Sequence, residues 1–149
     1  MRLTTKSEYA LLAAIDLAVA SHDGPINARA IAYRREVPLK FLEQILHGLR
    51  QAGIVTSIRG AHGGFILAQD PAELTVLDVV EAVEGPLTPT VCDAAKVGQV
   101  QEGKGCSKQS SCAAAHVWIQ ASKALRDEFS AITLDRLATN QKNFDGNHS

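Results

Sequence analysis

The chain has 149 residues and a formal net charge of −1 at neutral pH. This length is enough for one hydrophobic core with an added helical arm. No apolar run reaches membrane-spanning length, because Asp16 interrupts the longest one, between residues 10 and 20. The amino terminus is polar and lacks a secretory signal. We therefore expect a soluble, cytoplasmic protein that does not enter a membrane.

The charge is distributed unevenly along the chain. Residues 1–68 hold eight Lys or Arg against five Asp or Glu, and residues 69–149 hold seven against eleven. The near-neutral total argues against a nucleic-acid partner. The basic first half is nevertheless suited to face phosphate.

The first segment predicts two helices. Thr5 and Glu8 have the spacing of a capping box, and apolar residues follow at helical spacing, which predicts a helix from about residue 6 to residue 20. Asn27 is a residue type favoured at N-caps, and it predicts a short second helix that ends near Arg35.

A third helix begins at Val37-Pro38, since proline is favoured in a first helical turn. Its apolar residues form one stripe, which is Leu42, Ile45, Leu46 and Leu49. A second and a third helix joined by a tight turn resemble a helix-turn-helix.

A β-hairpin follows, with Gly53 as the C-cap of the third helix. Residues 54–58 and 65–67 alternate with a period of two, and the glycine-rich segment 59–64 lies between them. Three helices and such a hairpin predict a winged helix, so the fold class is mainly α with a small β-hairpin wing.

The second half predicts two further helices. Thr75 caps one, with Val76, Val79, Val80 and Val83 directed inward, and Gly85-Pro86 ends it. Residues 111–131 form a long helix that rises roughly 30 Å, with Val117, Ala121, Ala124, Leu125 and Ile132 on one side. That length exceeds what a small domain needs, so we expect it to pack against a second copy in a two-fold dimer. Thr133 opens a last short turn, and residues 140–149 are expected to form a frayed tail.

All three cysteines, Cys92, Cys106 and Cys112, lie within 21 residues of a polar, glycine-containing segment. Nothing near Cys106 would bury it, so packing does not explain this grouping. An odd count leaves one thiol over after intrachain pairing. A metal ion or cluster held by thiolates in a reducing compartment fits best, and iron-sulfur clusters and zinc suit thiolates almost equally.

Several longer motifs resemble the Rrf2 family of bacterial winged-helix transcriptional regulators, which includes the iron-sulfur regulators IscR, NsrR and RirA. The motifs are Met1-Arg-Leu-Thr-Thr-Lys, Phe41-Leu-Glu-Gln-Ile-Leu, Arg59-Gly-x-x-Gly-Gly-Phe-x-Leu and Leu74-Thr-Val-x-Asp-Val-Val-x-Ala-Val-Glu-Gly85. Together they are highly specific, and they cover residues 1–85 closely.

The resemblance implies a homodimeric DNA-binding regulator, expected to be a repressor. It implies a winged helix-turn-helix domain in 1–85, a cluster-binding loop in 86–110, a dimerisation helix in 111–139 and a flexible tail in 140–149. The three cysteines would bind an iron-sulfur cluster, 2Fe-2S or 4Fe-4S with a preference for 4Fe-4S. Thirteen residues separate Cys92 from Cys106, more than is usual in the family, which leaves the cluster type open.

The fourth ligand is expected from another residue. Glu8 matches the position at which some relatives supply a carboxylate from the partner subunit, and the alternative role for Glu8 is the capping box. His116 lies one residue beyond the position at which another branch uses a histidine, where this chain has Ala115.

The third helix carries Lys40, Glu43, Gln44 and His47 on the face opposite its leucines. Such residues usually form a solvated surface, but in a helix-turn-helix they favour a major-groove contact, with Gln44 pairing with adenine and Glu43 accepting from cytosine. At the hairpin tip, Arg59 and His62 are expected to enter the minor groove, with Gly60 allowing close backbone approach. The expected partner is a palindromic operator in double-stranded DNA.

Two other functions remain open. A cluster-free or zinc-stabilised winged-helix regulator would use the same DNA-binding half. An enzyme with a cysteine nucleophile is weaker, because His116 is the only histidine near the cysteines and no third group orients it. The signal is also open among nitric oxide, redox state, iron and cluster supply.

Overall fold

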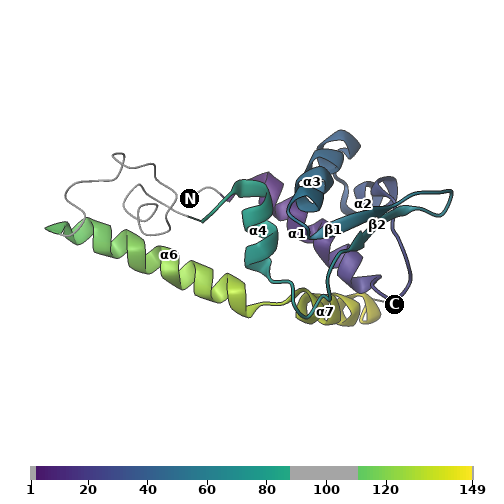
Figure 1. The fold of residues 1–149 in the computed structure, drawn as a ribbon. Helices are drawn as coiled ribbons and strands as arrows, with labels where there is room; N and C mark the ends of the chain where they lie inside the picture. Colours follow the sequence, from purple (N-terminus) through teal and green to yellow (C-terminus); the bar gives the residue numbers. More distant parts are fainter. Residues whose placement is uncertain (1–2, 88–110, 149) are drawn as a thin grey trace.

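The computed structural model describes residues 3–87 and 111–148, and Figure 1 shows their arrangement. In chain order the elements are α1 (Thr5–Val19), α2 (Ala28–Arg35), α3 (Leu39–Gln51), β1 (Val55–Ile58), β2 (Gly64–Leu67), α4 (Val76–Glu84), α6 (Ala113–Ala131) and α7 (Leu134–Gly146). Helices dominate and the two strands form one antiparallel hairpin. This architecture confirms the predicted fold class. Among residues 3–87 and 111–148, none of the helices has the length and hydropathy of a membrane-spanning segment.

The main core surrounds α1, which is rich in alanine. Ala10, Ala13 and Ala14 are completely buried, and their small side chains let the neighbouring helices approach α1 closely. The predicted stripe of α3 fills the space beside them, since Leu42, Ile45, Leu46 and Leu49 are all completely buried. A second, smaller cluster joins α4 to α6 through Val76, Val80 and Leu87.

The cap of α1 differs from the predicted one by a residue. Thr4, not Thr5, is the N-cap, and its side chain accepts a hydrogen bond from the Lys6 N–H at 3.2 Å. Ser7, not Glu8, completes the capping box by accepting from the Thr4 N–H. Glu8 thus has no capping role, and its side chain is exposed.

The starts of α2 and α4 and the wing agree with the sequence pattern, whereas Pro38 is the N-cap of α3 and not part of its first turn. Asn27 accepts from the Ala30 N–H at 2.8 Å, and Thr75 forms a capping box with Asp78. The strand register pairs Val55 with Leu67 and Ile58 with Gly64. An additional bridge between Ile26 and Phe65 ties β2, near its wing-tip end, to the segment between α1 and α2.

The end of the chain is helical, where a short turn and a frayed tail were expected. α7 runs from Leu134 to Gly146, so residues 140–146 are not a tail. Leu134 is completely buried and Ala138 is 6% exposed, because both pack into the core around α1. The predicted continuous arm, 111–139, is thus divided at Ile132 and Thr133, and α7 belongs to the winged-helix body.

The long helix α6 contacts the body along one side only. Ser122 is buried and donates to the Leu87 carbonyl oxygen, and Phe129 packs against the α4 cluster. The sequence predicted one apolar side for this helix, and its residues differ in exposure. Leu125 and Ile132 are half-buried, whereas Val117, Ala121 and Ala124 are exposed. Figure 1 shows the amino-terminal part of α6 extending away from the body. The exposed small residues therefore lie free on the outer face of the single chain.

Candidate functional site

The outer face of α3 carries four exposed polar side chains. Lys40, Glu43, Gln44 and His47 are separated by three and four residues, which places them on one face of the helix. The opposite face is the buried leucine and isoleucine stripe, so the core determines which side of α3 faces outward. The structure thus brings together the four residues predicted to contact bases.

Two more residues extend this face and were not identified from the sequence. Arg50 and Gln51 are both exposed in the last turn of α3, and each lies one helical turn beyond His47. The three- and four-residue spacing from His47 was the signal that could have identified them. Arg50 adds a cation at the carboxyl end of the face, where it also complements the helix dipole.

The position of α3 is fixed by its neighbours. Gly48 lies against α4: a Cβ built at Gly48 would be 3.8 Å from Val83 Cγ1 and 3.9 Å from the Ala82 carbonyl oxygen. The helix before α3 is held by an ion pair, in which Asp16 of α1 accepts from Arg35 Nη2 at 2.6 Å. Asp16 is only 2% exposed, so this pair lies in a region of low dielectric. Displacement of α1 or α4 would consequently move the recognition face.

The wing tip presents Arg59, Gly60 and His62 to solvent. Neither Arg59 nor His62 forms an ion pair or hydrogen bond within the described part of the chain, so both are available to a partner. The tip requires glycine: Gly60 has φ +124°, and a Cβ on Gly63 would collide with the Ile58 carbonyl oxygen. Figure 1 shows the tip extending beyond the helices.

The cysteine site is described only at one end. Cys92 and Cys106 lie outside the described residues. Cys112 is the N-cap of α6 and is a free, half-exposed thiol whose side chain makes no capping hydrogen bond. His116 is exposed one turn later. Within residues 3–87 and 111–148, three or more His, Cys, Asp or Glu side chains do not gather into a metal site.

The segment that leads to the first two cysteines is anchored on α6. Glu81 Oε1 accepts from the Leu87 N–H at 3.0 Å and also pairs with Arg126. Ser122 Oγ donates to the Leu87 carbonyl oxygen at 3.2 Å. Ser122 follows Cys112 by ten residues, about 15 Å along a helix. Leu87 and Cys112 are therefore held at separate points of the same helix.

Comparison with known proteins agrees with this geometry. Residues 3–140 match the model of the Rrf2 family, described as an iron-dependent transcriptional regulator. The chain is 34% identical over 145 residues to the HTH-type transcriptional regulator IscR of Photorhabdus laumondii, covering 97% of this chain and 84% of that protein. It is 34% identical over 134 residues to the protein rrf2 of Nitratidesulfovibrio vulgaris, covering 90% and 85%.

Solved structures give the same result. CymR, the global cysteine regulator of B. subtilis, superimposes with a TM-score of 0.75 at 31% identity, covering 94% of this chain and 98% of that one. IscR of T. potens superimposes with a TM-score of 0.74 at 28% identity, covering 95% and 88%. The similarity thus extends across both the winged helix and the long helix.

Proposed function

The chain belongs to the Rrf2 family of transcriptional regulators and is not an enzyme, and we propose that it is a homodimeric repressor whose operator binding is controlled by an iron-sulfur cluster. In this proposal the protein binds operator DNA in the cytoplasm. The main support is the exposed face of α3, which lies on the same winged-helix body as an unpaired arginine at the wing tip.

In this proposal α3 enters the major groove. Gln44 has the donor and acceptor needed for adenine, and Glu43 accepts from cytosine. Lys40 and Arg50 lie toward opposite ends of the exposed face, which suits phosphates on either side of the groove. Arg59 and His62 reach the adjacent minor groove or its phosphates, and Gly60 allows the backbone to come close.

Dimerisation through α6 is supported by its outer face. Ala113, Val117, Ala121 and Ala124 recur at three- and four-residue intervals, and Val117 is 58% exposed. Trp118, 48% exposed, lies at the edge of this face. Small residues allow two helices to approach closely, and burial of Val117 and Trp118 would stabilise the pair. A two-fold dimer would present two α3 helices to a palindromic site.

The cluster would be held by Cys92, Cys106 and Cys112, with Glu8 of the partner subunit as the fourth ligand. Cys112 fits this role because its thiol is free and half-exposed at the start of the dimer helix. Glu8 fits because its carboxylate is exposed and is not used in a cap. A bound cluster would supply an oxygen- and nitric oxide-sensitive group at the subunit boundary.

Operator selection tests this function. Anaerobically purified full-length protein would be incubated with a random double-stranded DNA library, and the bound fraction sequenced over several rounds. We expect a palindrome with half-sites separated by about one helical turn. Sedimentation of the protein with and without that palindrome should give one dimer per site. An unenriched library, or a monomer on a single half-site, would contradict the proposal.

A further inference from the structure

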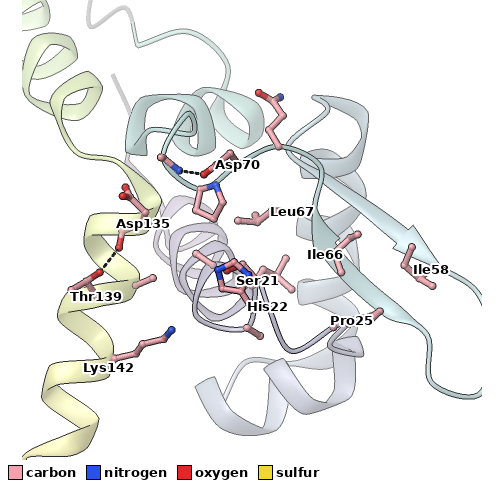
Figure 2. A pocket seen from close by; sticks show the side chains of 18 residues that line it. Ser21, His22, Pro25, Ile58, Ile66, Leu67, Asp70, Asp135, Thr139 and Lys142 are labelled. Atoms are coloured by element: carbon pink, nitrogen blue, oxygen red, sulfur yellow. Dashed lines mark hydrogen bonds between the residues drawn. The ribbon is translucent and has the colours of Figure 1, made fainter.

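A large open cavity lies away from the recognition face, where α7, the end of α1 and the wing meet. Its volume is about 800 Å³, within the range of sites that take small molecules. Figure 2 shows the side chains that line it. The cavity belongs to neither the proposed DNA surface nor the cysteine segment.

The inner wall of the cavity is apolar. Leu17 and Ala138 are buried at its floor, and Ile66 and Leu67 of β2 form a half-buried wall opposite α7. Pro71 also lines the cavity. Such a surface is suited to an apolar side chain, which would gain about 25 cal/mol for each Å² removed from water.

The rim carries charges of both signs. Lys142 of α7 and His22 after α1 line one part of the rim, and neither has a hydrogen-bond or ion-pair partner among residues 3–87 and 111–148. Figure 2 shows the Lys142 ammonium directed from α7 into the space between the helices. These two side chains offer donors to an anion.

Two carboxylates lie elsewhere on the same rim. Asp70 Oδ1 accepts from the Ala72 N–H at 2.8 Å, and Asp135 Oδ1 accepts from the Thr133 hydroxyl. In the described part of the chain, the second oxygen of each carboxylate has no partner. One oxygen thus holds each aspartate in place, and the other is available to a cation.

From these groups we infer that the cavity binds a small zwitterion with an apolar side chain, which is the chemistry of a free amino acid. The ligand's carboxylate would meet Lys142 and His22, its ammonium would meet Asp70 and Asp135, and its side chain would cover Ile66 and Leu67. Because Ile66 lies in the wing and Lys142 in α7, a bound ligand would join the wing to the body. That effect on the wing rests on the proposed DNA-binding function, but the binding itself does not.

Three matched compounds test the charge pattern. L-phenylalanine has both charges, 3-phenylpropionate lacks the amine, and 2-phenylethylamine lacks the carboxylate. Each would be titrated into the full-length protein without DNA, and the amide signals of Leu67 and Ala138 followed by NMR. We expect saturable shifts with L-phenylalanine, and about fivefold weaker binding of each singly charged compound.

Lys142→Gln should weaken the binding of L-phenylalanine and of 3-phenylpropionate about fivefold, because both carry the carboxylate, and leave the binding of 2-phenylethylamine unchanged. Lys123→Gln, the same change on the exposed part of α6, is the control and should alter none of the three. No saturable shift, equal binding of all three compounds, or an unchanged Lys142→Gln profile would each overturn the site. A failure here leaves operator selection unaffected, so the two proposals can fail separately.

Discussion

Ser7, in the first turn of α1, donates a hydrogen bond of 2.7 Å to the carboxylate of Glu84, the last residue of α4. The same carboxylate oxygen accepts from the Thr4 N–H at 3.1 Å and from the Thr4 hydroxyl. The amino end of α1 is thereby tied to the point where α4 leads toward the cysteine segment. This contact joins the two parts of the protein that the proposed mechanism must couple.

The first prediction concerns the ionisation of Glu84. Burial acts to raise its pKa, but the hydrogen bonds from Thr4 and Ser7 outweigh burial and hold the pKa below its ordinary value. The contact therefore contributes fully to stability above the ordinary carboxyl pKa and is lost as pH falls through the lowered one. We expect Glu84→Gln to lower the free energy of unfolding by about 1 kcal/mol at neutral pH.

Urea unfolding from neutral pH to below about pH 4 would measure this difference. The gap between wild type and Glu84→Gln should narrow as the medium becomes acidic. Glu73→Gln is the control, because Glu73 is exposed and its carboxylate makes no hydrogen bond in the described part of the chain. A gap that stays constant with pH would mean that the ionised carboxylate is not what Thr4 and Ser7 stabilise.

The second prediction concerns the buried ion pair. Arg35→Met should leave the buried Asp16 carboxylate with only its longer contact to the exposed Arg34, at a cost of about 3 kcal/mol in the free energy of unfolding. Arg34→Met should cost less than about 1 kcal/mol, because the Arg34 side chain is 54% exposed and lies 3.6 Å from the same carboxylate. Urea unfolding of the two variants measures the difference, and equal losses would contradict the assigned role of Arg35.

Several elements could be predicted from the sequence because their signals are local. Asn27 and Thr75 are capping residues before clear helical patterns, and the stripe of α3 has unbroken spacing. The cap of α1 could not be chosen locally, because Thr4 and Thr5 are adjacent and of the same type. The contact with Glu84, eighty residues away from Thr4, favours Thr4.

The extent of α7 was also set by distant contacts. Its carboxyl half is polar, which is typical of a tail. Two long-range hydrogen bonds nevertheless fix its start: the Leu134 N–H donates to the Leu74 carbonyl oxygen at 2.9 Å, and the Val76 N–H donates to the Ile132 carbonyl oxygen at 2.9 Å. These bonds anchor α7 beside α4 and place Leu134 and Ala138 in the core. Local composition does not predict these long-range hydrogen bonds. The cavity at Lys142 was missed for the same reason.

The third prediction separates two kinds of DNA contact. Arg59→Ala should weaken binding to all sequences and reduce the salt dependence of affinity, because a wing-tip arginine meets phosphate or minor groove. Gln44→Ala should instead relax the preference at one position of each half-site, at a cost of about 1–3 kcal/mol there. Fluorescence anisotropy with the selected palindrome and its single-base variants, at several salt concentrations, measures both effects. Wild-type salt slopes and preferences in both variants would rule out this docking.

The fourth prediction concerns the cysteines. Replacing Cys92, Cys106 or Cys112 singly with Ala should remove most of the bound iron and sulfide and bleach the visible absorbance of anaerobically purified protein. Each thiolate is one of four proposed protein ligands of the cluster, and the two remaining thiolates with one exchangeable carboxylate would not retain it. Stoichiometric zinc without sulfide would favour the zinc-stabilised alternative. Full iron and sulfide in all three variants would show that these thiols are not the ligands.

The last prediction is that Glu8 couples the cluster to the DNA-binding half. Glu8 is exposed and directly follows Ser7, which is fixed to Glu84. A carboxylate from one subunit that reached the other subunit's cluster would thus connect the cluster to α1 and, through Asp16 and Arg35, to the helix-turn-helix. Because carboxylate is a harder ligand for iron than thiolate, it should exchange first when the cluster is attacked.

Glu8→Gln should therefore retain much of its iron and sulfide but lose the difference in operator affinity between cluster-loaded and cluster-free protein. Since Glu8 does not cap α1, Glu8→Ala should behave alike, and both variants should unfold at the wild-type urea concentration. Anisotropy titrations before and after removal of the cluster measure the difference in operator affinity. His116→Ala is the matched control, and it should retain this difference. If the Glu8 variants still switch and His116→Ala does not, the coupling runs through α6 instead of α1, and the fourth ligand must be sought there.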